Sequence, residues 1–279
     1  MAIAHMFDTP PQGVATDWTM PQNWNQFTAE EHDSWDKLVD RQSHALERYA
    51  SRTFLNGLNL LHLTGKGIPD YRQLNPLLHA ATGWEVVAVP GIVPNDAFFQ
   101  HLSERRFPAA NFLREADSLD YSEEPDMFHD LFGHLPMLAN PVFAEFMVQY
   151  GRAGLRAEQW GMSGFLARLY LHTVEFGLVN EADGLRAYGA GMLSSYAETV
   201  HALTDADARH LRFDLPRVMR TDYLFDKFQR VYFVVDSFEE LLRVMEETDF
   251  AEVYRIIGAL PMIAPEDICE SDQPYLAEK

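Results

Sequence analysis

The chain has 279 residues, and its 47% hydrophobic and 23% charged residues are the balance of a folded globular protein with an apolar core. Its formal net charge of −20 argues against nucleic acids and anionic membranes as partners, because both attract clustered lysines and arginines. The single cysteine, Cys269, excludes an internal disulfide and a cysteine-rich metal site, and it favours a reducing, cytoplasmic setting.

The first 27 residues are rich in Pro, Gly and Gln and show no apolar periodicity, which predicts an extended N-terminal arm. They lack the basic start and apolar run of a signal peptide, and no run in the chain approaches the roughly 20 apolar residues of a membrane span. Thr28 and Glu31 form a capping-box pattern. We therefore expect helical structure from Thr28 to about residue 62, with a break near Asn56–Gly57.

Short strands and helices alternate in the next part of the chain. A helix over about 72–82 should end at Gly83, which is a favourable residue after a helix, and a strand should follow over Trp84–Val89. Asn95 is a good N-cap for another helix. Phe107–Leu113 is predicted as a second strand.

Helical patterns dominate after Pro125. Val231–Val235 is β-branched and predicts a strand, and Ser237 with Glu240 predicts a capping box for one more helix. The acidic segment after Pro265 is expected to fray. The other predicted helices cover about 125–133, 140–155, 163–180, 190–202 and 214–220.

Together these elements predict a mainly α fold of the α+β class. Its strands are too few and too scattered for a repeated βαβ array. We expect a single catalytic domain of many helices with a small β-sheet over residues 28–265, an extended arm over 1–27 and an acidic tail over 266–279.

The segment PDMFHDLFGHLP holds His129 and His134, which a glutamate, Glu175, follows in HTVEFG. Two imidazoles and one carboxylate are the ligand set that holds non-haem Fe(II) on one face. Five residues correspond to about 140° around an ideal helix, so both rings can share a metal only if the helix loosens near Gly133 and Pro136. The alternative is a pair of ordinary helix histidines.

Glu175 lies in the almost continuously apolar run SGFLARLYLHTVEFGLV. A buried carboxylate costs several kcal/mol unless it is paired or bound to a metal. Arg168, seven residues earlier on the same helix face, is an alternative partner in a buried ion pair. By spacing alone, His172 is also a candidate metal ligand.

Three motifs in order, PDMFHDLFGHLP, LYLHTVEFGL and AYGAGMLSSYAE, resemble the catalytic domain of the pterin-dependent aromatic amino acid hydroxylases. The similarity runs from about Gly91 to Phe238 and is greatest to bacterial members that act on phenylalanine. The resemblance implies that His129, His134 and Glu175 are the iron ligands. It implies that His172 is not, because that family position is usually aromatic.

The resemblance also implies a substrate site. Arg114 matches the arginine that holds the substrate carboxylate, a task suited to the two parallel hydrogen bonds of a guanidinium. Without the resemblance, Arg114 in FLREADS would be read as a surface ion-pair residue. The other substrate-side positions implied are Tyr121, Ser122, Glu124, Pro125, Leu171, Gly191, Ser194 and Ser195.

The implied cofactors are Fe(II) and tetrahydrobiopterin or a related tetrahydropterin, with O₂ as co-substrate. Phe98 matches the aromatic residue that stacks on the pterin, and of Phe98 and Phe99 one is expected to pack in the core. The other cofactor positions implied are Val93, Asn95, Asp130, Ala167 and Tyr170.

Two departures from the family pattern bear on substrate choice. Leu171 and His172 stand where the family commonly carries an aromatic pair, and Phe225 stands where phenylalanine hydroxylases usually carry a branched aliphatic residue. Neither departure touches an implied ligand or Arg114.

The resemblance implies an iron- and tetrahydropterin-dependent monooxygenase that converts L-phenylalanine to L-tyrosine. One alternative is the same chemistry on L-tryptophan or another aromatic amino acid. A second is a zinc-dependent hydrolase with the same three ligands, although no glutamate stands between the histidines as in HExxH. A third is a non-catalytic binding module. We expect a monomer, because the acidic tail has no heptad pattern.

Overall fold

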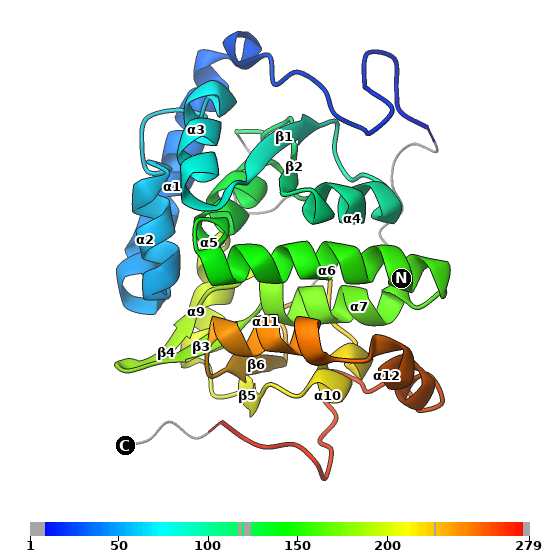
Figure 1. The fold of residues 1–279 in the computed structure, drawn as a ribbon. Coiled ribbons are helices and arrows are strands. Elements are labelled where there is room, and N and C mark those ends of the chain that lie inside the picture. The colour runs from blue at the N-terminus through cyan, green and yellow to red at the C-terminus, as the bar shows by residue number, and fades with distance from the viewer. Residues whose placement is uncertain (1–8, 117–118, 120–123, 226, 276–279) are drawn as a thin grey trace.

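Helices surround two small β-sheets in the computed structural model, which describes residues 9–116, 119, 124–225 and 227–275 (Figure 1). The predicted class, mainly α with a small amount of β-structure, is confirmed. The first elements are η1 (Trp24–Gln26), α1 (Ala29–Tyr49), α2 (Arg52–Leu60), α3 (Tyr71–Thr82), β1 (Glu85–Val89), α4 (Asn95–Ser103), β2 (Arg106–Ala110), η2 (His129–His134) and α5 (Leu135–Leu138).

The second half of the chain contains the larger of the two sheets, which has four strands. Its elements are α6 (Pro141–Gln159), α7 (Ser163–Tyr170), η3 (Leu171–Glu175), β3 (Leu178–Glu181), β4 (Gly184–Ala187), α8 (Ala190–Leu193), α9 (Tyr196–Thr204), β5 (Arg209–Arg212), α10 (Leu215–Arg220), β6 (Val231–Val235), α11 (Phe238–Glu247) and α12 (Phe250–Ile257).

Helix α1 begins at the predicted capping box. The Thr28 hydroxyl accepts a bond of 3.2 Å from the Glu31 amide, and the Glu31 carboxylate accepts one of 2.7 Å from the Thr28 amide. The predicted break near Asn56–Gly57 is wrong, because the first helix ends at Tyr49. There Ala50 forms a bridge with a residue far along the chain, Ala187, and the local sequence does not show that contact.

Gly57 lies inside α2 because two helices approach each other closely there. A Cβ atom at Gly57 would lie 1.9 Å from the backbone oxygen of Pro136 in α5. No other residue type fits this contact without displacing backbone.

The first sheet consists of β1 and β2, which are parallel, with Glu85 opposite Arg106. β1 agrees with its prediction, but β2 ends at Ala110, three residues before the predicted end. Gly83 ends α3 at φ 76° as expected. Asn95 is the first residue of α4 rather than its N-cap, a position that Pro94 takes.

The second sheet has the strand order β4-β3-β6-β5. β6 was predicted, and all five of its residues are buried between parallel neighbours. The prediction of one helix over 163–180 is wrong beyond residue 175, where the β3–β4 hairpin begins. β5 and α12 were not predicted, and the segment 190–202 forms two helices, α8 and α9, rather than one.

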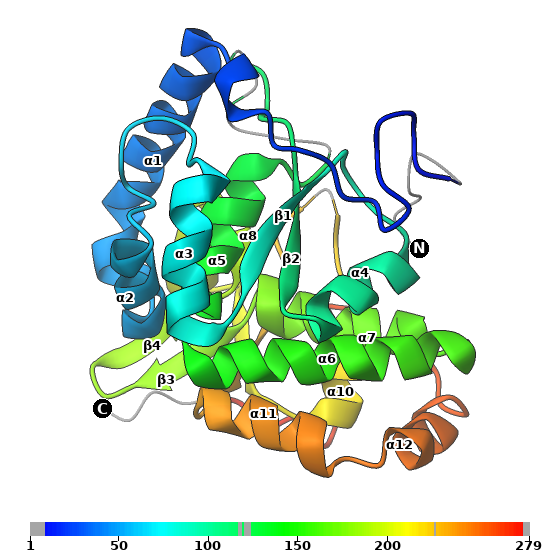
Figure 2. The same ribbon diagram turned by 45° about the horizontal axis from the view of Figure 1, so that its top comes forward.

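Helix α6 is the central element of the core, with α4 on one side and α11 on the other (Figure 2). Small residues of α6 permit this packing. A Cβ atom at Gly154 would lie 2.2 Å from the ring of Phe99, and one at Gly151 would lie 2.6 Å from the Ser103 amide. Phe99 is therefore the core member of the Phe98–Phe99 pair, with 3% of its surface exposed.

Both ends of the described chain pack on the domain. In the arm, Trp18 is buried and Met20 forms a bridge with Ala88 of β1. Near the C-terminus, Asp272 forms an ion pair of 2.7 Å with Arg217, so the described part of the acidic tail is not frayed. The division into arm, domain and tail stays a prediction.

At the start of α11 the expected capping box forms in part. The Ser237 hydroxyl accepts a bond from the Glu240 amide, whereas the Glu240 carboxylate accepts one from the amide of Asp236 rather than of Ser237. Of the described helices, none is long and apolar enough by itself to span a bilayer. The pair His129–Leu138 and Pro141–Gln159 meets that test only together and is bent by 112° at its break.

We predict that Gly57→Ala lowers the free energy of unfolding by at least about 2 kcal/mol, because the new methyl overlaps backbone of α5. Gly164→Ala in α7 is the matched control, since its nearest contact would be 3.6 Å away at the end of Arg168. The control should gain up to about 1 kcal/mol from helix propensity. Urea denaturation of both variants measures this, and equal effects would contradict the close approach.

Candidate metal centre

The two segments that carry the candidate ligands are both π-helical. His129 and His134 are the first and last residues of η2, and Glu175 is the last residue of η3. In a π-helix the backbone bonds run from i to i+5, so residues five apart stack on one face. The helix loosening expected near Gly133 therefore takes the form of a π-turn. It brings the two Nε2 atoms to 3.1 Å from each other.

Glu175 completes a compact set of three ligand atoms. Its Oε1 lies 3.1 Å from His134 Nε2, and its Oε2 lies 3.5 Å from His129 Nε2. Ligands at about 2.1 Å from one metal ion, on adjacent corners of an octahedron, are about 3 Å apart. The donor set and its spacing thus fit a single divalent ion with one face left open.

Electrostatics hold these three groups together. Burial alone would lower the pKa of His129, but the adjacent Glu175 carboxylate raises it to about 9. Burial alone would raise the pKa of Glu175, but His134 and His129 hold it well below its usual range. A metal ion that binds here takes the place of the proton on this pair.

Ser194 sets the tautomer of His129. The Ser194 hydroxyl donates to the Ala190 carbonyl at 2.8 Å, so its oxygen accepts a bond of 2.9 Å from Nδ1–H of His129. Nδ1 therefore carries a proton in both charge states of the ring, and the proton that a metal ion displaces is the one on Nε2, which faces Glu175. The resemblance implies that the turn with Ser194 faces substrate and also supports the metal site, and the bond to His129 is a support of this kind.

The glycine-rich turn before Ser194 lies directly against Glu175. A Cβ atom at Gly191 would be 3.2 Å from Oε2 of Glu175, and one at Gly189 would be 2.2 Å from its backbone oxygen. At Gly189 only glycine permits this approach, and at Gly191 a side chain would be tightly packed. Ser195 caps α9 through a bond from the Glu198 amide.

The two alternatives for the polar face of α7 and η3 are wrong. Arg168 does not pair with Glu175, because its guanidinium binds the carboxylate of Asp222 at 2.7 Å. His172 is not part of the ligand cluster. Its ring is buried and its Nε2 lies 3.1 Å from the Thr221 carbonyl.

Arg114 is not a surface ion-pair residue. Its Nε and Nη2 donate bonds of 2.7 Å to the two oxygens of Asp126, a fully buried carboxylate. Asp126 also accepts the backbone amide of His129 at 3.0 Å. Burial alone would raise the pKa of Asp126, but the Arg114 guanidinium and two backbone amides together lower it. Asp126 was not predicted as a site residue, although it stands three residues before His129 in PDMFHD.

The other residues predicted on the substrate side differ in their exposure. Tyr121 and Ser122 lie outside the described residues. Glu124 is half-buried next to Gly91, and Pro125 is exposed. Leu171 is half-buried at the start of η3. Phe225, one of the two departures, is 58% exposed and packs against Tyr223 at 4.6 Å between ring centroids.

Aromatic rings connect the cofactor-side residues to the ligands. The ring of half-buried Phe98 lies 5.7 Å from that of Tyr170, which lies 6.0 Å from the His134 ring. Asp130 is buried, and its carboxylate accepts a bond of 2.7 Å from the Ala110 amide. Burial raises the pKa of Asp130 to about 6, although His129 and His134 oppose the shift.

Three more residues were predicted on the cofactor side. Val93 is buried beside Trp18, and Asn95 is exposed and donates a bond of 2.9 Å to Glu158. Ala167 lies on the exposed side of α7.

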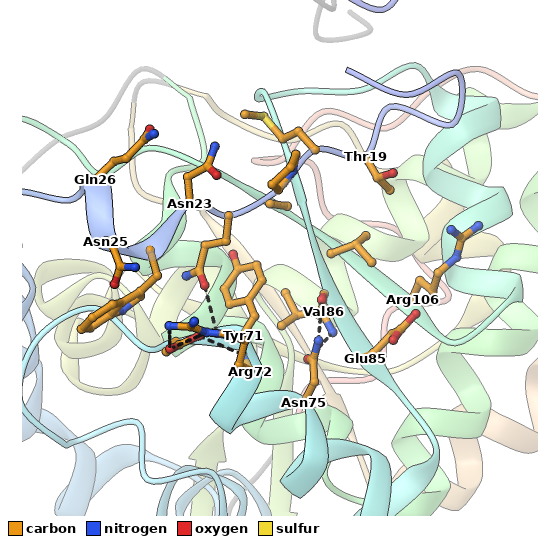
Figure 3. Close-up of a pocket in the computed structure, with 17 residues that line it drawn as sticks. Thr19, Asn23, Asn25, Gln26, Tyr71, Arg72, Asn75, Glu85, Val86 and Arg106 are labelled. Atoms are coloured by element: carbon orange, nitrogen blue, oxygen red, sulfur yellow. Dashed lines mark hydrogen bonds and ion pairs between the residues drawn. The ribbon is translucent and has the colours of Figure 1, made fainter. Parts of the chain in front are cut away.

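A separate cavity of about 710 Å³ lies between residues 19–26, the start of α3 and β1 (Figure 3). None of the three candidate ligands lines it. Two of its amide side chains bond within the protein. Gln22 bonds the backbone of Pro69 and Tyr71, which attaches the arm to the start of α3, and Asn75 bonds the backbone of Val86, which joins α3 to β1.

Fold and site together define a mononuclear metal enzyme with a two-histidine, one-carboxylate centre. Residues 15–257 match the family model of the biopterin-dependent aromatic amino acid hydroxylases. The chain belongs to this family.

Its relatives include a phenylalanine-4-hydroxylase of Caulobacter vibrioides, 49% identical over 94% of this chain and 89% of the relative. The cobalt-bound phenylalanine hydroxylase of Chromobacterium violaceum superposes with a TM-score of 0.92 at 44% identity, over 96% of this chain and 95% of that one. The structure of that enzyme with iron and phenylalanine has a TM-score of 0.89 at 44% identity, over 96% of both chains.

We predict that the apparent affinity for Co(II) rises about tenfold per pH unit between about pH 6 and 8. The pKa of His129 is raised to about 9, so below that pH the metal must displace a proton, and this competition weakens as pH rises. Titration calorimetry in buffers of different ionisation enthalpy should show about one proton released per metal bound. An affinity that is constant over this range would contradict the pairing of His129 with Glu175.

Proposed function

We propose that this protein is a phenylalanine 4-monooxygenase, which converts L-phenylalanine to L-tyrosine with Fe(II), a tetrahydropterin and O₂. The observation that carries the proposal is the convergence of His129, His134 and Glu175 in a member of this hydroxylase family. The names of the relatives, phenylalanine-4-hydroxylases, support phenylalanine as the substrate.

The three ligands would hold Fe(II) on one face and leave the opposite face to O₂ and the reactants. The bound iron and the reduced pterin supply the oxygen chemistry, and the protein supplies position and a water-poor cavity. Ser194 keeps a proton on Nδ1 of His129, so that Nε2 is the nitrogen that would bind the metal. The Gly191 turn leaves space beside the Glu175 carboxylate.

Arg114 would bind the carboxylate of the amino acid. Asp126 occupies its Nε and one N–H of Nη2, and the Leu119 carbonyl lies 3.4 Å from Nη1. One N–H on each terminal nitrogen then remains for a bidentate bond to the substrate. Because Asp126 also binds the His129 amide, the substrate clamp and the metal ligand share one support. We assign the rest of the substrate side to Tyr121, Ser122, Glu124, Pro125, Leu171, Gly191, Ser194 and Ser195.

Phe98 would stack on the pterin. Its ring is half-buried and stands two ring contacts from the metal ligand His134, through Tyr170. Asp130, buried beside His129, would face the polar edge of the pterin. The proposed pterin site also includes Val93, Asn95, Ala167 and Tyr170.

We predict that the purified protein reconstituted with Fe(II) forms tyrosine from phenylalanine only when a tetrahydropterin and O₂ are present. A competition between phenylalanine and tryptophan measures kcat/KM for each. A higher kcat/KM for tryptophan would favour the alternative substrate, which Leu171 suggested. Pterin-independent hydrolysis by a zinc-loaded protein would favour the hydrolase instead.

We expect Glu175→Gln to lose most of its Fe(II) binding and at least about a hundredfold in turnover, because the neutral amide is a weaker ligand for a hard cation. Glu181→Gln, in strand β3 and outside the cluster, is the control and should retain both. Near-normal iron content and activity in Glu175→Gln would contradict the ligand assignment.

We also propose that the protein is a cytoplasmic monomer. The single cysteine is typical of a reducing compartment, and the described C-terminal segment binds its own domain through Arg217 and Asp272. Light scattering in solution should give the mass of one chain. The mass of a dimer or tetramer would contradict the monomer, and recovery from a secreted fraction would contradict the location.

A further inference from the structure

The helix that carries Glu175 is attached along its polar face to one short segment, Thr221–Asp222. Arg168 binds the Asp222 carboxylate at 2.7 Å, and one turn later His172 lies with Nε2 3.1 Å from the Thr221 carbonyl. Glu175 follows three residues after His172, at the end of the π-turn. The bond at His172 thus ties this helix to another segment three residues before the metal ligand.

The segment that receives this bond is itself strongly held. The Thr221 hydroxyl accepts a bond of 2.8 Å from Arg217 Nη1 and donates one of 2.6 Å to the Arg217 carbonyl. Arg217 is paired at 2.7 Å with Asp272, and the side chains of this pair are only 5% and 4% exposed. Thr221 also forms a bridge with Ile263. The C-terminal segment therefore fixes the position of the Thr221 carbonyl.

The π-turn needs such a support. Its i to i+5 bond, from the Phe176 amide to the Leu171 carbonyl, is 2.9 Å long, yet short π-turns are rare and depend on their surroundings. His172 is 1% exposed and packs edge-on against Phe233 at 5.2 Å, so its ring cannot turn to another partner. Burial lowers the pKa of His172 to about 4, which leaves a neutral ring that donates from Nε2.

We infer that His172 is a positioning residue, which sets the place of the Glu175 carboxylate by anchoring the π-turn to Thr221, and that Arg217 and Asp272 hold that anchor from the C-terminal segment. This inference rests on the proposed metal site. It gives a role to a residue at which the chain departs from its family, and that role requires a hydrogen-bond donor at this position.

Co(II) binding to the full chain tests the inference without turnover, because the visible absorption of Co(II) reports the geometry of its ligands. His172→Phe keeps a ring but removes the donor, and His172→Gln restores a donor near the place of Nε2. His210→Phe is the matched control, since His210 also bonds a backbone carbonyl, that of Ala202 at 2.6 Å, but lies on β5 outside the metal site.

We predict that His172→Phe weakens Co(II) binding about tenfold and changes the intensity of its visible bands. His172→Gln should recover most of the affinity, and His210→Phe should keep wild-type affinity and spectrum even if its Tm falls. If His172→Phe does not fold, Asp272→Asn loosens the same anchor and should weaken Co(II) binding severalfold.

Unchanged affinity and spectrum in a folded His172→Phe, or unchanged affinity in Asp272→Asn where that variant serves as the test, would overturn the inference. A loss of affinity in His210→Phe as large as in His172→Phe would also overturn it, since the effect would then be general destabilisation. If the wild type binds no Co(II), the proposed function fails at the metal site itself. Wild-type binding with an unaffected His172→Phe contradicts the inference alone.

Discussion

The structure depends on one geometric constraint: two ligands five residues apart, and a third from another helix, must meet within about 3 Å. An α-helix would turn His129 and His134 apart, and the π-turn brings them together. This turn packs closely against α8. Gly133 lies so close to Ala190 that a Cβ atom would be 2.9 Å from the Ala190 oxygen. The same segment, through Ser194, orients His129.

Charge balance explains why the polar groups beside this centre tolerate burial. Asp126 has no exposed surface, yet it accepts four bonds, two from the Arg114 side chain and two from backbone amides. Removal of either partner would leave a buried charge, which costs more than the pair contributes. Arg114 is therefore held rigidly, and in its proposed role little side-chain entropy would be lost on binding.

Signals that act within a few residues were predictable from the sequence. The Thr28 capping box, the end of α3 at Gly83 and strand β6 are all of this kind. The break at Ala50 and the strand β5 depend on partners far along the chain, which local patterns do not record. The site follows the same division. Ligand types could be read from the motifs, whereas the support from Asp126 and the anchor at His172 required the packed structure.

The two departures from the family pattern have different physical consequences. His172 is buried in the core, where its ring packs against Phe233 and bonds the Thr221 carbonyl. His172 therefore affects the metal site, through the backbone of the π-turn that ends at Glu175. Leu171, its half-buried neighbour, has no such bond and differs from the family residue mainly in size and shape. Any change in substrate choice should then come from Leu171, while the chemistry depends on a π-turn that His172 helps to hold.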